Sequence, residues 1–150
     1  MTVVDTIIDK FKTDLIDSIQ TSRGYNTDPM VKYGVYLQTE VPSLPFVGFA
    51  DDGIEIEQLM SGNALGWITI FVYGYANWGG IETTSSIRDL ALDVMYFIYN
   101  EYTYTDDTKF TSKVEILPGN DSNPVSVFSV EIKVKFHYTN TVINKDMRRL

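Results

Sequence analysis

The stretch LGWITIFVYGYA, residues 65–76, is hydrophobic on both of the faces that a β-strand would present. Because successive side chains of a strand point to opposite sides of a sheet, Ile68, Ile70 and Val72 share one face. The other face carries Thr69 and four large aromatic groups, Trp67, Phe71, Tyr73 and Tyr75. Two interpretations are open: the strand is central in a sheet covered on both sides, or a partner subunit buries its aromatic face.

On both sides of this strand the chain alternates between helical and extended patterns. Apolar residues at spacings of three and four predict amphipathic helices over residues 3–22 and 85–102. Strict alternation of apolar and polar residues predicts a strand over residues 125–139. The sequence Asp-Asp-Gly at 51–53 is typical of a tight turn between two strands. The remaining strands are expected at residues 31–40, 46–50, 54–60 and 112–117.

The order of these elements, α-β-β-β-β-α-β-β, predicts the fold class. Short connections favour antiparallel neighbours, so we expect an α+β fold with a mostly antiparallel sheet of about six strands and both helices packed on one face. Residues 1–139 are expected to form a single domain. Residues 140–150 show no periodicity and are interpreted as a C-terminal tail that is mobile or binds a partner.

The amino-acid composition and the net charge of the chain exclude several classes of function. The 150 residues are 44% hydrophobic and 13% aromatic, which suits a globular domain with a large core. The chain has no cysteine, which excludes disulfides, thiolate metal sites and cysteine nucleophiles. A net charge of −8 argues against a protein that neutralises nucleic-acid phosphates. No signal peptide and no apolar stretch long enough for a membrane span are apparent, so we expect a soluble protein made in the cytosol, with no membrane partner.

No pattern in the sequence predicts catalysis. The single histidine, His137, has no partner at metal-ligand spacing, and the glycines form no phosphate-binding loop. Paired acids at 51–52 and 106–107 are typical of turns. We therefore expect no enzyme, and no catalytic, cofactor-binding or metal site.

The layout of the chain resembles the tail terminator, or tail completion, proteins of tailed bacteriophages. The resemblance covers residues 3–139 and rests on the order of the segments, their lengths and their patterns of apolar and polar residues. After the leading amphipathic helix, these segments are TEVPSLPFVGFADDG, GWITIFVYGYA, TTSSIRDLALDVMYFIYNEY and VEILPGNDSNPVSVFSVEIKVKFHYT.

The resemblance implies a structural protein of the virion tail or neck. It implies a homo-hexameric ring that caps the tail tube, stops its polymerisation and joins it to the head connector, while DNA passes through an acidic lumen without specific binding. The candidate subunit interface is Trp67, Phe71, Tyr73, Tyr75 and Trp78. The candidate acidic lumen or loop surface is Asp51, Asp52, Glu55 and Glu57. The candidate partner-binding tail carries Lys145, Arg148 and Arg149.

Two other functions stay open. Another neck or head-completion protein would share this order and this hydrophobicity pattern of the segments. A small-molecule or peptide-binding domain would use the aromatic strand to line a pocket rather than an interface. An ordinary solvated strand face equally explains the acidic residues.

Overall fold

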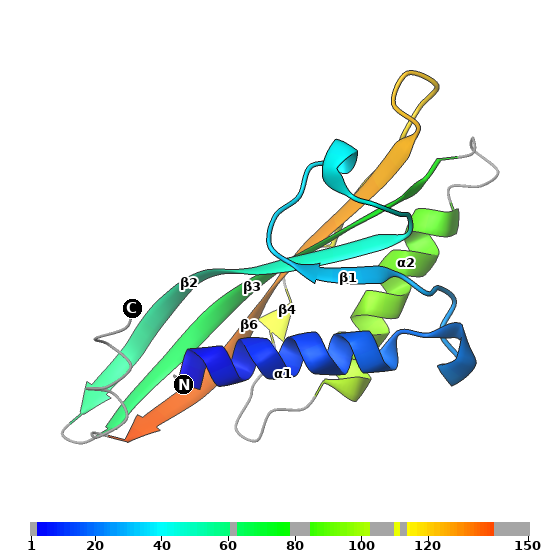
Figure 1. The fold of residues 1–150 in the computed structure, drawn as a ribbon. Coiled ribbons are helices and arrows are strands. Elements are labelled where there is room, and N and C mark those ends of the chain that lie inside the picture. Colours follow the sequence, from blue (N-terminus) through cyan, green and yellow to red (C-terminus); the bar gives the residue numbers. More distant parts are fainter. Residues whose placement is uncertain (1–2, 61–62, 79–84, 103–109, 112–113, 140–150) are drawn as a thin grey trace.

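A computed structural model describes residues 3–60, 63–78, 85–102, 110–111 and 114–139 of the chain. The described residues form one twisted sheet with two α-helices packed on it (Figure 1). The helices are α1 (Val3–Ser18) and α2 (Ser85–Tyr96), and a π-helical turn, Phe97–Glu101, continues α2. The fold is therefore α+β, as the sequence predicts.

The sheet has six strands but is five strands wide. The strands are β1 (Met30–Tyr33), β2 (Phe46–Met60), β3 (Asn63–Asn77), β4 (Phe110–Thr111), β5 (Glu115–Leu117) and β6 (Val125–Thr139). Their order is β1-β2-β3-β6-β4, and β5 also pairs with β6. The short strands β4 and β5 bond successive stretches of the same edge of β6. All of these pairs are antiparallel except β1 with β2, which is parallel.

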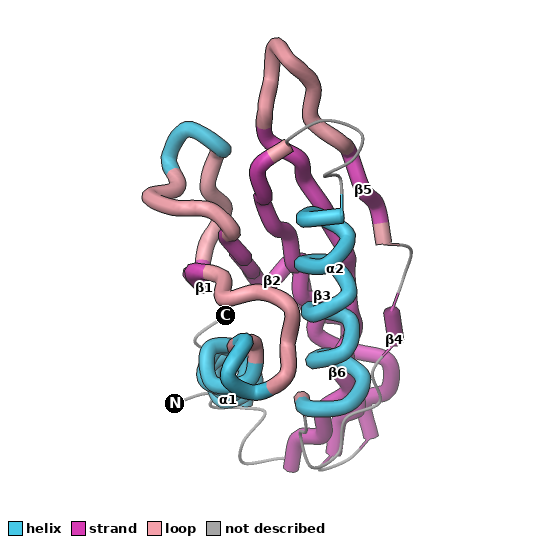
Figure 2. The backbone as a smooth tube through the Cα atoms, turned by 90° about the vertical axis from the view of Figure 1, so that its right-hand side faces the viewer, coloured by secondary structure: helices cyan, strands magenta, loops and turns pink. Residues whose placement is uncertain are grey.

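Both helices contribute to one hydrophobic core on the same face of the sheet, which we call the helix face. Ile68, Ile70 and Val72 of β3 are fully buried there, which confirms the side predicted for them. Figure 2 shows α2 running in front of the strands. The core residues that the helices contribute include Ile7, Phe11 and Leu15 from α1 and Ile87, Leu90 and Val94 from α2.

The prediction of two strands separated by a turn at Asp51–Gly53 is wrong, because β2 runs through these residues. Asp51 pairs with Ile70 and Ile54 with Ile68, so three steps along β2 match two along β3. This is a β-bulge, and it keeps the long strand paired while moving the next side chains to the opposite faces. Gly53 adopts φ 125°, a conformation that favours glycine. The observed order is therefore α-β-β-β-α-β-β-β.

Three predicted elements are shorter than expected. The first helix ends at Ser18, because Gln20 is already extended with φ −144° and ψ 140°. The strand predicted at 31–40 ends at Tyr33, where Gly34 with φ 119° bends the chain away from the sheet. Of the strand predicted at 112–117, Glu115–Leu117 form β5, Val114 precedes the strand, and residues 112–113 lie outside the described residues, while the strand predicted at 125–139 has the observed bounds of β6.

Candidate functional site

The face of the sheet opposite the helices, which we call the second face, is partly covered by the chain itself. Residues 34–45 connect β1 to β2 and include a short 3-10 helix at Gln38–Glu40. This connection, the 34–45 loop, lies against Phe46, Tyr73 and Tyr75. Tyr73 is 3% exposed and Tyr75 is 9% exposed. These two members of the predicted subunit interface are therefore buried within one chain. The loop residues that pack on them are Tyr36, Val41 and Leu44.

Tyrosine hydroxyls hold the 34–45 loop in place. The Tyr73 hydroxyl donates to the Gly34 carbonyl at 2.7 Å and accepts from the Tyr36 amide at 2.8 Å. The Tyr75 hydroxyl donates to the Tyr36 carbonyl, also at 2.7 Å. Burial raises the pKa of both hydroxyls. Because the loop leaves the sheet at Gly34, these three bonds supply backbone partners that a strand would otherwise supply.

Trp67 and Phe71 lie further along the second face and are half-buried. The Phe71 ring stacks on Tyr73 with centroids 5.7 Å apart, and the Lys135 ammonium lies 5.3 Å from the centre of the Trp67 ring. Trp78 is also half-buried, beyond the end of β3, and its amide donates to the Pro124 carbonyl at 2.8 Å. Of the predicted interface, Trp67, Phe71 and Trp78 thus retain solvent-accessible surface.

Three of the predicted acidic residues are exposed around the bulge of β2: Asp51, Asp52 and Glu55. Asp51 accepts a hydrogen bond from the Tyr33 hydroxyl, and this bond, with burial and the carboxylate charge, raises the pKa of Tyr33 to about 12. Glu55 forms an ion pair of 3.5 Å with Lys133 across β3. The Glu57 side chain and the tail with Lys145, Arg148 and Arg149 lie outside the described part.

A buried carboxylate joins α2 to the segment that follows α1. Asp93 is 3% exposed, and both of its oxygens accept from the Asn26 backbone amide at 3.1 Å. It also accepts from the Asn26 side chain and from the Thr27 hydroxyl. A buried charge with this many donors is a structural anchor, because losing the donors would leave it unsolvated.

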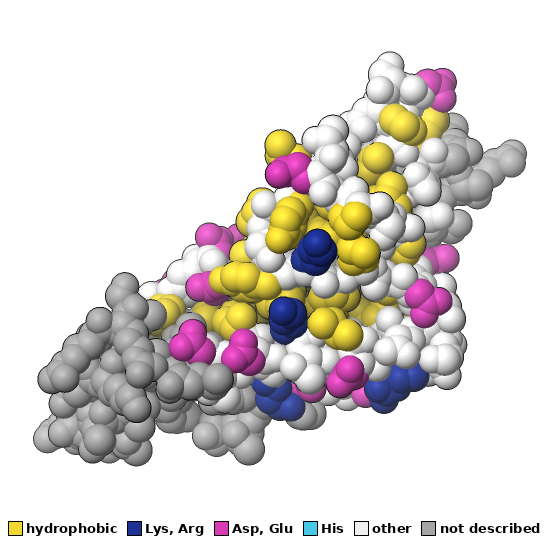
Figure 3. Space-filling view, viewed as in Figure 1, with side chains coloured by type: hydrophobic (Ala, Val, Ile, Leu, Met, Phe, Trp, Pro, Cys, Tyr) yellow, Lys and Arg dark blue, Asp and Glu magenta, His cyan; other side chains and the backbone are white. Residues whose placement is uncertain are grey.

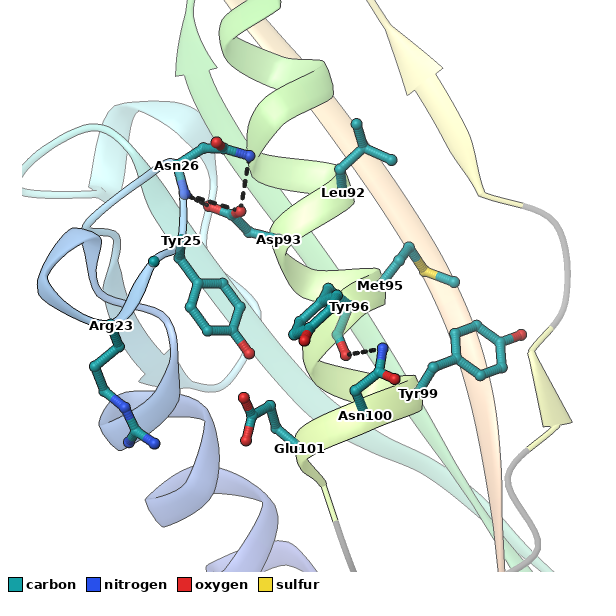
Figure 4. Close-up of a pocket in the computed structure, with 11 residues that line it drawn as sticks. Arg23, Tyr25, Asn26, Leu92, Asp93, Met95, Tyr96, Tyr99, Asn100 and Glu101 are labelled. Atoms are coloured by element: carbon teal, nitrogen blue, oxygen red, sulfur yellow. Dashed lines mark hydrogen bonds between the residues drawn. The ribbon is translucent and has the colours of Figure 1, made fainter.

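Beside this anchor lies a pocket of about 660 Å³ between residues 23–26 and the outer side of α2 and its π-helical turn (Figure 4). We call it the tyrosine pocket. The Tyr25 and Tyr96 rings meet edge to face there, 5.6 Å apart at 83°. Tyr99 and Leu92 are more than half exposed on its rim. The side chains that line it are Arg23, Tyr25, Asn26, Leu92, Asp93, Met95, Tyr96, Tyr99, Asn100 and Glu101.

The pocket is electrostatically negative around Tyr25. Burial, followed by the negative charges of Glu101 and Asp93, raises the pKa of Tyr25 to about 12. The Tyr25 hydroxyl is buried, and a hydrogen-bonding interaction with the Glu101 carboxylate contributes to the raised pKa, although no described residue meets normal hydrogen-bond distance and angle to it. Among the described residues of the lining, Arg23 is the only cationic group, and its Nη1 donates to the Asp17 carbonyl at 2.7 Å instead.

Sequence reasoning missed the tyrosine bonds that hold the 34–45 loop, the buried Asp93 anchor and the tyrosine pocket. The sequence carries a weak signal for the first two. Gly48 interrupts β2 directly opposite Tyr73, and a glycine inside a strand often marks a close approach. Asp93 stands within the apolar stripe of α2, where a charge needs buried partners. The long-range pairing of Tyr25 with Tyr96 has no signature in one sequence.

Two further searches bear on the class of site. Within the described ranges, no three or more carboxylate or histidine side chains gather in a way that could hold a metal ion. None of the helices formed by the described residues has the length and apolar character to cross a membrane.

Comparison with known proteins gives no family assignment. No protein-family model matches the chain, and a search of the curated proteins finds no match.

Proposed function

We propose that this protein is a structural component of a phage tail, a tail terminator that assembles head to tail into a hexameric ring on the tail tube. One observation carries the proposal. Each outer edge of the described sheet lacks a strand partner, and the two edges expose different apolar side chains.

The first edge is formed by β1 and the start of the 34–45 loop. Figure 3 shows hydrophobic side chains gathered over this part of the molecule, with basic groups among them. Val35 is 70% exposed, and Leu37, Tyr33 and Met30 are also exposed. We call this surface the β1 edge. Open strand edges that carry apolar groups promote association unless something covers them.

The second edge is formed by β5, where Leu117 is 70% exposed and Ile116 is exposed as well. A shallow pocket of about 490 Å³ lies along this strand and the adjoining part of β6. We call this surface the β5 edge. Because the two edges differ, pairing the β1 edge of one copy with the β5 edge of the next is a heterologous contact, which generates rings when the rotation closes.

Two other features support the proposal. Trp67 and Phe71 keep accessible surface on the second face, where a neighbouring subunit can cover them. The net charge of −8 suits a lumen through which DNA slides without binding. The tail tube protein and the head connector are the partners that the two rims of such a ring would contact. Another neck protein with a ring architecture is the second candidate, and tail morphology distinguishes the two.

Two variants test the head-to-tail contact. Val35→Asp disables the β1 edge and Leu117→Asp disables the β5 edge, and both sites are exposed enough for the monomer to fold. Each variant alone is expected to stay monomeric in native mass spectrometry, with the tail tube protein present if assembly requires it. A mixture of the two has one intact contact and should give dimers but nothing larger.

Ser122→Asp, an added charge in the exposed loop before β6, is the matched control and should assemble as the unmodified protein does. Full-sized rings from either edge variant alone, or from their mixture, would remove the two-edge contact from the proposal.

A further inference from the structure

The tyrosine pocket has the shape of an aromatic corner with a carboxylate beside it. The Tyr25 and Tyr96 rings stand nearly perpendicular, and Figure 4 shows the Tyr25 hydroxyl directed toward the Glu101 side of the pocket. Tyr99 and Leu92 extend the apolar surface at the rim. Faces of aromatic rings attract cations, and this attraction strengthens where water is excluded.

The charges in the lining point to the same class of ligand. Asp93 and Glu101 contribute two carboxylates, and Glu101 forms no ion pair with another described residue. The Arg23 guanidinium is held by the carbonyl of Asp17 near the end of α1. An anion would be repelled by both carboxylates.

We propose that the tyrosine pocket binds an arginine or lysine side chain carried by a partner polypeptide. The cation lies against the exposed Tyr96 ring and pairs with Glu101, while the partner backbone crosses the exposed rim. A volume of about 660 Å³ exceeds what a bare ion needs and suits a side chain together with its backbone. Charged donors to carboxylates and aromatic contacts are frequent anchors of protein interfaces.

This site is separate from the ring contact proposed above. None of its lining residues belongs to the β1 edge or to the β5 edge. It can therefore be tested on the Leu117→Asp variant, in which the ring contact is disabled. Whether this variant binds the probe therefore reports on the tyrosine pocket alone and not on the ring contact.

The experiment is an NMR titration of ¹⁵N-labelled protein with short blocked tripeptides at millimolar concentration. The probes are acetyl-Gly-Arg-Gly-amide and acetyl-Gly-Lys-Gly-amide, with the Leu and Glu peptides of the same form as controls. Saturable shifts are expected at the amides of Asn26, Tyr96 and Asn100 with the two cationic peptides, and should weaken as salt rises. Saturation elsewhere, equal binding of the Leu peptide, or no shift at all would overturn the proposal.

Two variants identify the groups that bind. Glu101→Gln is expected to weaken the cationic peptides about fivefold, the effect of one partly exposed ion pair. Tyr96→Leu keeps the apolar contact but removes the ring, and should weaken them by about three- to fivefold. Glu115→Gln, an exposed glutamate of β5 outside the pocket, should leave the affinity unchanged. Unchanged affinity in both pocket variants, with spectra that report an intact fold, would contradict the proposed contacts.

Discussion

The ring of Tyr73 occupies the space above Gly48, its antiparallel partner on β2. A Cβ added at residue 48 would lie 2.2 Å from the Tyr73 Cζ atom, well inside van der Waals contact. The same side chain reaches the Gly34 carbonyl with its hydroxyl. One tyrosine thus joins two strands and the 34–45 loop, and it can do so because residue 48 has no side chain.

Gly48→Ala is therefore expected to destabilise the protein. The new methyl group displaces the Tyr73 ring, and overpacking of this kind costs about 1–3 kcal/mol. Urea denaturation followed by far-ultraviolet circular dichroism measures the loss. In a Tyr73→Leu background the clash is removed, so the cost of Gly48→Ala should shrink. Equal costs in the two backgrounds would show that the Tyr73 ring is not the group displaced.

Removing the Tyr73 hydroxyl should release the 34–45 loop. Tyr73→Phe leaves the Gly34 carbonyl and the Tyr36 amide without their partner, at a cost of about 1–3 kcal/mol in the free energy of unfolding. Amide hydrogen exchange should accelerate at Tyr36 more than in the centre of β3. Tyr99→Phe, which removes an exposed hydroxyl, is the control and is expected to change neither measurement. Loop exchange that stays at the original rate in Tyr73→Phe would rule out this anchor.

Replacing Asp93 should separate the 25–28 segment from α2. Asp93→Ala removes the acceptor of four hydrogen bonds from Asn26 and Thr27. Asn26 is exposed and Thr27 is half-buried, so water can replace part of the lost bonding, and a loss of about 1–3 kcal/mol in the free energy of unfolding is expected. Asp121→Asn, at an exposed loop position, serves as the control in thermal and urea unfolding. Equal stability of the two variants would refute the anchoring role.

Stability should fall as the pH rises above 10. The pKa values of Tyr25 and Tyr33 rise from an ordinary value of 10.0 to about 12, and those of Tyr73 and Tyr75 also rise. Between these values the folded protein holds more protons than the unfolded chain, so this contribution is complete below pH 10 and is lost as the pH approaches 12. Urea midpoints across this range, with tyrosinate absorbance recorded in parallel, measure the effect.

Tyr25→Phe is the matched variant for this pH dependence. It removes one titrating group from the tyrosine pocket and should therefore reduce the fall in stability at high pH. A urea midpoint that is level from pH 9 to about 12 in the unmodified protein would be incompatible with these raised pKa values.

The periodicity of the sequence predicts much of the fold. The bounds of β6 and the helix-facing side of Ile68, Ile70 and Val72 follow from strand alternation and are confirmed. The bulge at Asp51–Gly53 could not be distinguished from a turn, because both use the same residues. The choice depends on whether β3 is long enough to pair with both halves of β2, which is a tertiary property.

The second face shows where a local pattern was insufficient. The aromatic side of β3 is apolar enough to predict that another segment or subunit buries it. Which one does so depends on the path of the 34–45 loop. That path is fixed by Gly34 and by bonds to Tyr73 and Tyr75, which are separated from the loop by about forty residues of sequence. Trp67 and Phe71, beyond the reach of the loop, keep the surface on which the interface hypothesis now depends.

The most direct test of the tail terminator proposal is electron microscopy of particles made by a phage whose copy of this gene is interrupted. The proposal predicts tails of uncontrolled, excess length that carry no heads, and restoration of normal tails when the intact gene is supplied in trans. A gene that encodes the Leu117→Asp variant, in which the β5 edge is disabled, should fail to restore normal tails. A gene that encodes the Ser122→Asp control should restore them. Particles with tails of normal length joined to heads, in the absence of this protein, would contradict the proposal.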